Sequence, residues 1–198
     1  MLEDLDTIFV SSVLEPSAGK GDLVRAIADK KRIHNRYGNS KLDVDCCEID
    51  PYLRQILRYN FSGERIHELE PSGRSFNPEA ETIRGTDLHI VHDNFLTYRS
   101  YKHYDLILMN PPFADGDKHL LKALDMQKDG GLVICLLNAE TLNNAYTTSR
   151  QMLARKLKEL NADVRFVEDA FSSAERSAEV DVAIVRVHIP LVVHESTI

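Results

Sequence analysis

The residues of this sequence best suited to chemistry are an asparagine, two prolines and a phenylalanine: Asn110, Pro111, Pro112 and Phe113. They follow an apolar run at 105–109, which predicts a buried strand. Because proline fixes its own backbone angle and restricts the preceding residue, the two prolines make a stiff turn. That turn holds the Asn110 side chain beside the Pro111 carbonyl. Both are hydrogen-bond acceptors that suit the two hydrogens of a planar –NH₂ group, and Phe113 offers a ring face for stacking.

A second candidate site is a strand-to-helix turn of small residues, Glu15-Pro16-Ser17-Ala18-Gly19-Lys20-Gly21. Glycine lets backbone approach a ligand closely, and the start of a helix presents N–H groups. The dinucleotide pattern GxGxxG needs a glycine at position 24, where Val24 stands, so a nicotinamide or flavin site is disfavoured. Glu48 ends the next predicted strand, where a carboxylate can accept both hydroxyls of a ribose. Turn and carboxylate together predict a nucleoside-containing ligand.

The elements that must position these residues alternate between strands and helices. Apolar runs and helical spacing predict strands at 13–14, 42–49, 89–91, 104–109, 132–137, 164–167 and 182–189, and helices after Gly21 and at 52–59, 118–127 and 148–160. This order predicts an α/β fold: one Rossmann-like, doubly wound, mostly parallel seven-stranded sheet with helices on both faces. No helix is evident between the last two strands, so the last strand is expected to be antiparallel. Ligands bind such sheets at the carboxyl ends of the strands, where the candidate residues lie.

Composition and charge limit the classes of binding partner that this chain can have. The chain has 198 residues with 24 Lys and Arg against 31 Asp and Glu, a net charge of −7. That charge argues against a general nucleic-acid coat or a polybasic membrane binder, though a local basic face stays compatible with it. No signal-peptide pattern is evident, and the longest apolar run, 132–137, is too short to span a bilayer. Three cysteines, Cys46, Cys47 and Cys135, match neither a disulfide framework nor a zinc site and fit a reducing cytoplasm.

The length predicts a single domain over residues 1–198. A polar stretch at 62–85 is long for a connection within a compact domain, which indicates an insertion or a functional flap. No separate target-recognition domain is evident.

With these motifs in view, the chain resembles the class I S-adenosylmethionine-dependent methyltransferases, in the branch that methylates amino groups. Residues 15–21 look like the family's cofactor loop, Glu48-Ile49-Asp50 like its ribose-binding motif, and residues 110–113 like its catalytic tetrapeptide. The form ending in phenylalanine is most similar to DNA adenine-N6 methyltransferases. The resemblance therefore implies methyl transfer from S-adenosylmethionine to an exocyclic amino nitrogen, above all adenine N6 in DNA. S-adenosylhomocysteine would be the product, and no metal is needed.

The resemblance also assigns roles to single residues. Asn110 and the Pro111 carbonyl would orient the amine and stabilise its developing charge, while Phe113 would stack on a flipped-out base. The family often bonds the cofactor adenine through an acid placed directly before an aromatic residue. Here either Asp93 or Asn94 can serve, and Asp93 is favoured, with Phe95 as an apolar wall or ordinary core. Phe171 is a candidate second aromatic against the base, with a core or lid role equally open. The implied cofactor-binding residues are Glu15, Pro16, Ser17, Ala18, Gly19, Gly21, Glu48, Ile49, Asp93, Asn94, Phe95 and Asn110.

Alternatives to a DNA methyltransferase stay open. One is methylation of an RNA base or of a protein glutamine amide. Another is a cofactor-binding subunit that is inactive without a partner. DNA is the expected partner, a specificity subunit or a homodimer is a further option, and no membrane is expected.

Other residues have plainer interpretations. Lys31 and His119 are expected on solvent-facing helix surfaces. The acidic turn 115–117 is interpreted as a helix N-cap and not as a metal site. The cations of the 148–160 helix are expected to be solvated, although they could touch phosphate if that helix borders the active-site mouth; they are Arg150, Arg155, Lys156 and Lys158.

Overall fold

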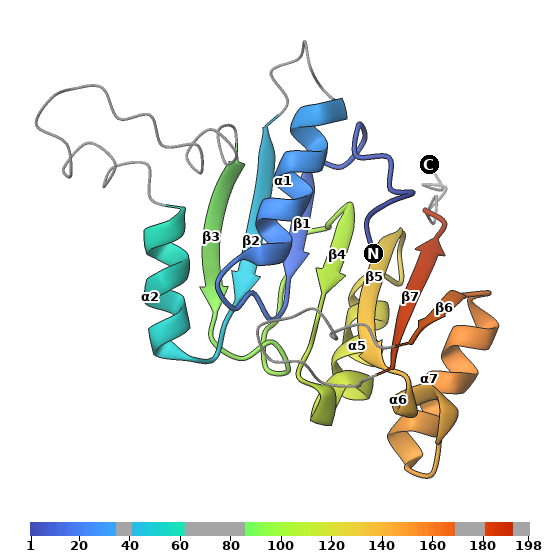
Figure 1. Ribbon diagram of the computed structural model, residues 1–198. Coiled ribbons are helices and arrows are strands. Elements are labelled where there is room, and N and C mark those ends of the chain that lie inside the picture. Colours follow the sequence, from blue (N-terminus) through green and yellow to red (C-terminus); the bar gives the residue numbers. More distant parts are fainter. Residues whose placement is uncertain (35–40, 62–85, 169–180, 192–198) are drawn as a thin grey trace, which may run out of the picture. The chain divides into compact units, whose positions relative to one another are not determined.

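The structure is a computed structural model that describes residues 1–34, 41–61, 86–168 and 181–191 (Figure 1). The chain divides into two compact units, residues 2–101 and residues 102–198 with Met1. The expectation of one domain over the whole chain stays a prediction. The expected insertion at 62–85 lies outside the described residues, and so does Phe171.

Within the described residues, the first unit has three strands and two helices, and the second has four strands with the other described helices. The first has β1 (Ser12–Glu15), α1 (Asp22–His34), β2 (Leu42–Cys47), α2 (Pro51–Asn60) and β3 (Thr86–His92). The second has β4 (Leu106–Met109), the 3₁₀ turn η1 (Phe113–Asp115), α5 (Gly116–Met126), β5 (Gly131–Asn138), α6 (Glu140–Asn143), α7 (Thr148–Glu159), β6 (Asp163–Val167) and β7 (Val182–Ile189).

The strands have the order β3-β2-β1-β4-β5-β7-β6 of a seven-stranded sheet. β1, β2 and β3 pair in parallel, as do β4 and β5, whereas β7 runs antiparallel to both β5 and β6. The predicted fold class is therefore confirmed: an α/β, mostly parallel sheet whose last strand is antiparallel.

In the first unit, apolar side chains of β1 and β2 build the core. Val13 pairs with Val44 in the parallel register, and both are buried. Helix α1 contacts β2 and buries Val24, Ile27 and Ala28, which lie three and four residues apart and so form one face. Burial of these side chains, at about 25 cal/mol per Å² of apolar surface, stabilises the part of the sheet that carries the first candidate site.

The turn before α1 fits closely against the end of α2. Gly19 and Gly21 both have positive φ, at 55° and 92°. A Cβ at position 21 would lie 2.4 Å from Cε2 of Phe61, so only glycine fits there without displacement. The Asn60 amide also donates to the Lys20 carbonyl at 3.0 Å. Close packing thus fixes the shape of the turn.

In the second unit, two glycines start β5 beside β4. Gly130 and Gly131 have φ of 130° and 127°, which are favourable for glycine alone. The buried Gln127 amide donates to the carbonyl of Tyr104, two residues before β4, at 2.7 Å. A Cβ at position 131 would lie 2.4 Å from Nε2 of Gln127. The glycine pair therefore sets where β5 begins.

Two helix residues expected at the surface are buried instead. Lys31 lies on the inner face of α1, and its ammonium donates to the carbonyls of Thr7, at 3.2 Å, and Val10. His119 is buried in α5, with Nδ1 at 2.9 Å from the Asp115 carbonyl. Both predictions of surface exposure were wrong. The segment that contains Thr7 and Val10 covers Lys31, and His119 lies on the buried face of α5. Asp115 stands at the N-cap position of α5, as expected for the acidic turn at 115–117, but its side chain makes no capping hydrogen bond and pairs with Lys118 Nζ at 2.6 Å.

Candidate functional site

Glu15, at the end of β1, places a carboxyl group in the interior. Its side chain is buried, and Oε2 has no hydrogen-bond partner among the described residues. Burial raises the pKa of Glu15 well above its ordinary value, and the nearby charges of Asp22 and Glu48 raise this pKa further. Buried carboxylates without a partner are rare in folded proteins. A cationic group placed against Glu15 would favour its charged form, lower this raised pKa and supply the partner that Oε2 lacks.

Glu48, just beyond β2, ties the turn to the sheet. Its Oε2 accepts the Gly19 N–H at 2.7 Å, and its Oε1 accepts the Asp50 N–H at 2.8 Å. The Ala18 N–H also donates to the Cys47 carbonyl at 3.0 Å. A carboxylate offers about four lone-pair sites, so acceptor capacity for two hydroxyl groups remains. The structure thus brings together Glu15, the glycine turn and Glu48, which the sequence analysis had grouped.

A neighbouring arginine fixes the backbone around Glu48. Arg54, on the first turns of α2, donates from Nη1 to the carbonyls of Glu48, at 2.7 Å, and Ile49, at 2.9 Å. Asp50 begins the same helix by accepting the Tyr52 N–H at 2.7 Å. These bonds leave the Ile49 side chain 66% exposed, next to the Glu48 carboxylate. The role of Arg54 could not be predicted from the sequence, because an arginine six residues after a carboxylate matches no motif.

The end of β3 lies beside Glu48, and its hydrogen bonds distinguish Asp93 from Asn94, the two candidates for binding the amine of the cofactor adenine. The Glu48 N–H donates to the His92 carbonyl at 3.3 Å. Asn94 uses its side-chain oxygen within its own turn, where it accepts the Leu96 N–H at 2.9 Å. The Asp93 side chain is 64% exposed, and its Oδ1 accepts the Asn94 N–H at 2.7 Å. The geometry supports Asp93 as the acceptor for a ligand amine. That role stays a prediction, as does the wall role of Phe95, whose ring is buried in the core.

The tetrapeptide lies in the second unit, directly after β4. Asn110 and Pro112 are exposed, Pro111 is buried, and Phe113 is 37% exposed where η1 begins. Pro112 has the extended angles φ −53° and ψ 130°, as a stiff turn requires. Among the described residues, no hydrogen bond is made to the Asn110 side chain or the Pro111 carbonyl. The end of β4 therefore carries two acceptors that accept no hydrogen bond within the described residues, next to a partly exposed aromatic ring.

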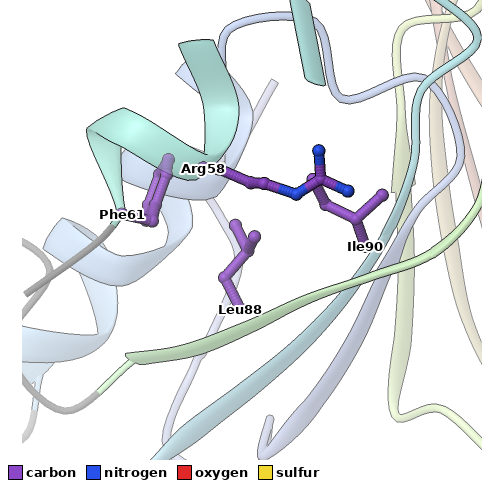
Figure 2. Close-up of a pocket in the computed structure, with 4 residues that line it drawn as sticks. All are labelled: Arg58, Phe61, Leu88 and Ile90. Atoms are coloured by element: carbon purple, nitrogen blue, oxygen red, sulfur yellow. The ribbon is translucent and has the colours of Figure 1, made fainter. Parts of the chain in front are cut away.

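A separate hollow of about 290 Å³ lies between α2 and β3. Figure 2 shows its lining: Arg58 of α2 and Phe61 directly after that helix, facing Leu88 and Ile90 of β3. None of the predicted cofactor-binding residues lines it, so this hollow is not the candidate site. In the described part of the chain, no group of three or more His, Cys, Asp or Glu side chains is arranged to hold a metal ion. No helix there is both long and apolar enough to cross a membrane.

No family model matches this sequence. The chain is 27% identical over 112 residues to tRNA1(Val) (adenine(37)-N6)-methyltransferase of Aliivibrio fischeri (strain MJ11), which is 57% of this chain and 37% of that protein. A Listeria monocytogenes protein assigned to the class I S-adenosylmethionine-dependent methyltransferases matches with a TM-score of 0.59 and 10% identity, over 95% of this chain and 56% of that chain. The 23S rRNA methyltransferase ErmE matches with a TM-score of 0.57 and 20% identity, over 93% of this chain and 65% of that chain. This chain has the class I S-adenosylmethionine-dependent methyltransferase fold.

The methyltransferase fold agrees with the family resemblance drawn from the motifs. The curated relative is matched over only 37% of its length, so its acceptor, a tRNA adenine, is a property of that relative. Both nucleic acids named by these similar proteins, tRNA and 23S rRNA, are RNA. The expectation of DNA as the acceptor thus gains no support from them.

Proposed function

We propose that this protein is an S-adenosylmethionine-dependent N-methyltransferase that acts on the exocyclic amino nitrogen of adenine in a nucleic acid. The observation that carries the proposal is the pair of acceptors at the end of β4, the Asn110 amide oxygen and the Pro111 carbonyl. Neither accepts a hydrogen bond among the described residues. An amino group on a planar ring brings the two hydrogens that such a pair of acceptors needs.

The residues of the first unit fit the cofactor. The Oε2 of Glu15, which lacks a partner among the described residues, would gain one in the positively charged part of S-adenosylmethionine, whose charge would also favour the ionised form of the carboxyl group. The remaining lone pairs of Glu48 suit the ribose hydroxyls, and Gly19, with open space where a Cβ would lie, permits close approach. Exposed Ile49 and Asp93 suit the adenine ring and its amine. When bound, the cofactor supplies an electrophilic methyl group.

The protein's own contribution to the reaction is to prepare the nucleophile. The lone pair of an adenine amine is delocalised into the ring. Asn110 and the Pro111 carbonyl, by accepting both amine hydrogens, hold the nitrogen so that its lone pair faces the methyl donor. The same acceptors stabilise the positive charge that develops on nitrogen. Phe113 stacks on the base, and since neither acceptor is a strong base, the proton leaves to water.

We propose RNA as the acceptor and DNA as the alternative. RNA is supported by the acceptors named for the two similar proteins, tRNA and 23S rRNA. DNA is supported by the Asn-Pro-Pro-Phe form of the tetrapeptide. In either case the target adenine must be unpaired or flipped out of a duplex.

The catalytic part of the proposal is tested by Asn110→Ala. Loss of one preorganised acceptor is expected to lower the rate about a hundredfold or more, while cofactor affinity stays within about twofold. Transfer of labelled methyl to RNA, DNA and protein acceptors would be measured beside Asn143→Ala, an exposed asparagine on α6 that should change nothing. Near-wild-type turnover by Asn110→Ala would defeat the assigned role, and label in protein alone would defeat the nucleic-acid acceptor.

The cofactor part is tested by Glu48→Ala. This change removes the acceptor for the ribose and the charge-assisted bond to the Gly19 N–H. Since such bonds contribute about 1.5–3 kcal/mol, affinity should fall by about 10- to 150-fold in calorimetry with S-adenosylhomocysteine. Glu159→Ala, on the exposed side of α7, is the matched control. Unchanged affinity of Glu48→Ala would count against the ribose assignment.

A further inference from the structure

An exposed tyrosine and an arginine form a stacked pair after β5. Tyr146 is 68% exposed, and the guanidinium of Arg150 lies over one face of its ring, with Cζ 5.0 Å from the ring centroid. Arginine over one face leaves the other face of the ring for a further planar group. Neither residue belongs to the cofactor-binding set or to the tetrapeptide.

Backbone contacts hold this pair in place. Arg150 donates from Nη1 to the carbonyls of Glu140, at 3.3 Å, and Asn144, at 3.1 Å. Its own N–H donates to the Thr147 hydroxyl at 3.2 Å, which starts α7. The guanidinium is therefore anchored on α6 and on the loop after it. A preorganised ring of this kind loses little conformational entropy when a ligand stacks on it.

The helix that follows is locally basic. α7 carries four Arg and Lys residues against one Glu, in a chain whose net charge is −7. Its apolar face is buried through Leu153 and Leu157, so the cations face outward. The exposed cations are Arg155, Lys156 and Lys158. This is the local basic face that an acidic nucleic-acid enzyme requires.

Topology places the pair at the same edge of the second unit as the tetrapeptide. β4 and β5 pair in parallel, with Met109 beside Cys135, so their carboxyl ends point the same way. Asn110 follows directly after β4, and α6 and Tyr146 follow β5. Figure 1 shows the start of α5 and α6 at this common end of the strands.

We infer that Tyr146, backed by Arg150, is a stacking platform for an unpaired base of a single-stranded RNA segment next to the target adenine, whose phosphates lie along the basic face of α7. This inference rests on the proposed function and names its substrate surface. An aromatic ring binds any base through its face, while the Lys and Arg side chains bind phosphate without reading sequence.

Binding measurements without methyl transfer test the platform. A fluorescent single-stranded adenine-containing oligoribonucleotide and a duplex DNA of equal length would be titrated with the full chain, by anisotropy. Tyr146→Ala is expected to weaken binding of the RNA by about 5- to 150-fold, and Tyr146→Phe by less than about twofold. Tyr101→Ala removes another exposed tyrosine and should leave the affinity unchanged. Lys156→Gln should lower the slope of log affinity against log salt by about one.

The outcomes separate this inference from the function it rests on. If Tyr146→Ala binds RNA like the wild type and melts at the wild-type temperature, the platform is overturned. The proposed function would still stand if Asn110→Ala lost methyl transfer in the same set of experiments. If Tyr146 matters equally for duplex DNA, the assignment to single-stranded RNA is overturned. If no nucleic acid binds or is methylated, both proposals fail.

Discussion

The buried carboxyl of Glu15 makes the stability of this protein depend on pH in a way that Glu15→Gln should abolish. Burial, with the charges of Asp22 and Glu48, raises the pKa of Glu15 well above its ordinary value. In the unfolded chain this pKa returns to about 4.3. The folded protein therefore holds the proton more tightly than the unfolded chain does. The stability from this group is fully present below about pH 4.3 and is lost as pH rises through the folded pKa.

The magnitude of the effect follows from linkage. Between the two pKa values the native state binds one more proton at Glu15 than the unfolded state. The free energy of unfolding therefore falls by about 1.4 kcal/mol for each pH unit from this group alone. Glutamine has nearly the same shape and no proton to lose in this range. The difference between wild type and Glu15→Gln should thus move by about 1.4 kcal/mol per unit in favour of the variant as pH rises.

Urea unfolding at half-unit pH steps would measure the effect, with the m-value checked for constancy. The difference between the two proteins cancels the titration of the other groups that they share. Glu140→Gln, an exposed carboxylate on α6, serves as the control and should follow the wild type. Parallel curves for wild type and Glu15→Gln between pH 4.5 and pH 7 would refute the raised pKa and its cause in burial.

Two further predictions concern residues that hold the first unit together. Lys31→Met removes the bonds from its buried ammonium to the carbonyls of Thr7 and Val10 and should lower the free energy of unfolding by about 2–4 kcal/mol. Lys30→Met removes a single bond, to the Glu3 carbonyl, from a half-buried position and should cost under about 1 kcal/mol in the same denaturation assay; equal costs would contradict the assigned contacts. Gly21→Ala combines a positive φ of 92° with a Cβ 2.4 Å from the Phe61 ring and should cost about 2–4 kcal/mol. Gly19→Ala, with φ of 55° and nothing within 4 Å, should cost about 1–2 kcal/mol, and a reversed order in thermal unfolding would refute the close-packing argument.

The sequence predicted the succession of strands along the chain well, because strands such as β4 and β5 are apolar runs bounded by turn residues. The run 182–189 predicts β7 over the same residues, and the pair Gly130 and Gly131 marks the start of β5. The glycine turn and Glu48 were also grouped correctly, since parallel strands bring their carboxyl ends to one edge. Contacts that depend on tertiary packing, such as the Arg54 bonds to two carbonyls, leave no sequence pattern.

The two wrong surface assignments did leave a signal. Lys31 continues the spacing of the buried residues Val24, Ile27 and Ala28, and so lies on the inner face of α1. His119 continues the inner face of α5 with Leu120 and Ala123 in the same way. In both cases residue type outweighed periodicity in the prediction, although position on the helix decides which way a side chain faces.

The two hydrogen bonds that the Glu48 carboxylate accepts from the Gly19 and Asp50 N–H groups limit which residues can occupy position 48. A side chain there must first satisfy two backbone N–H groups and only then a ligand. Aspartate is one methylene shorter, and an amide side chain would turn a donor toward a donor. The glycine turn and the carboxylate therefore form one structural unit, in which a change of ligand preference at residue 48 would demand a matching change of the turn.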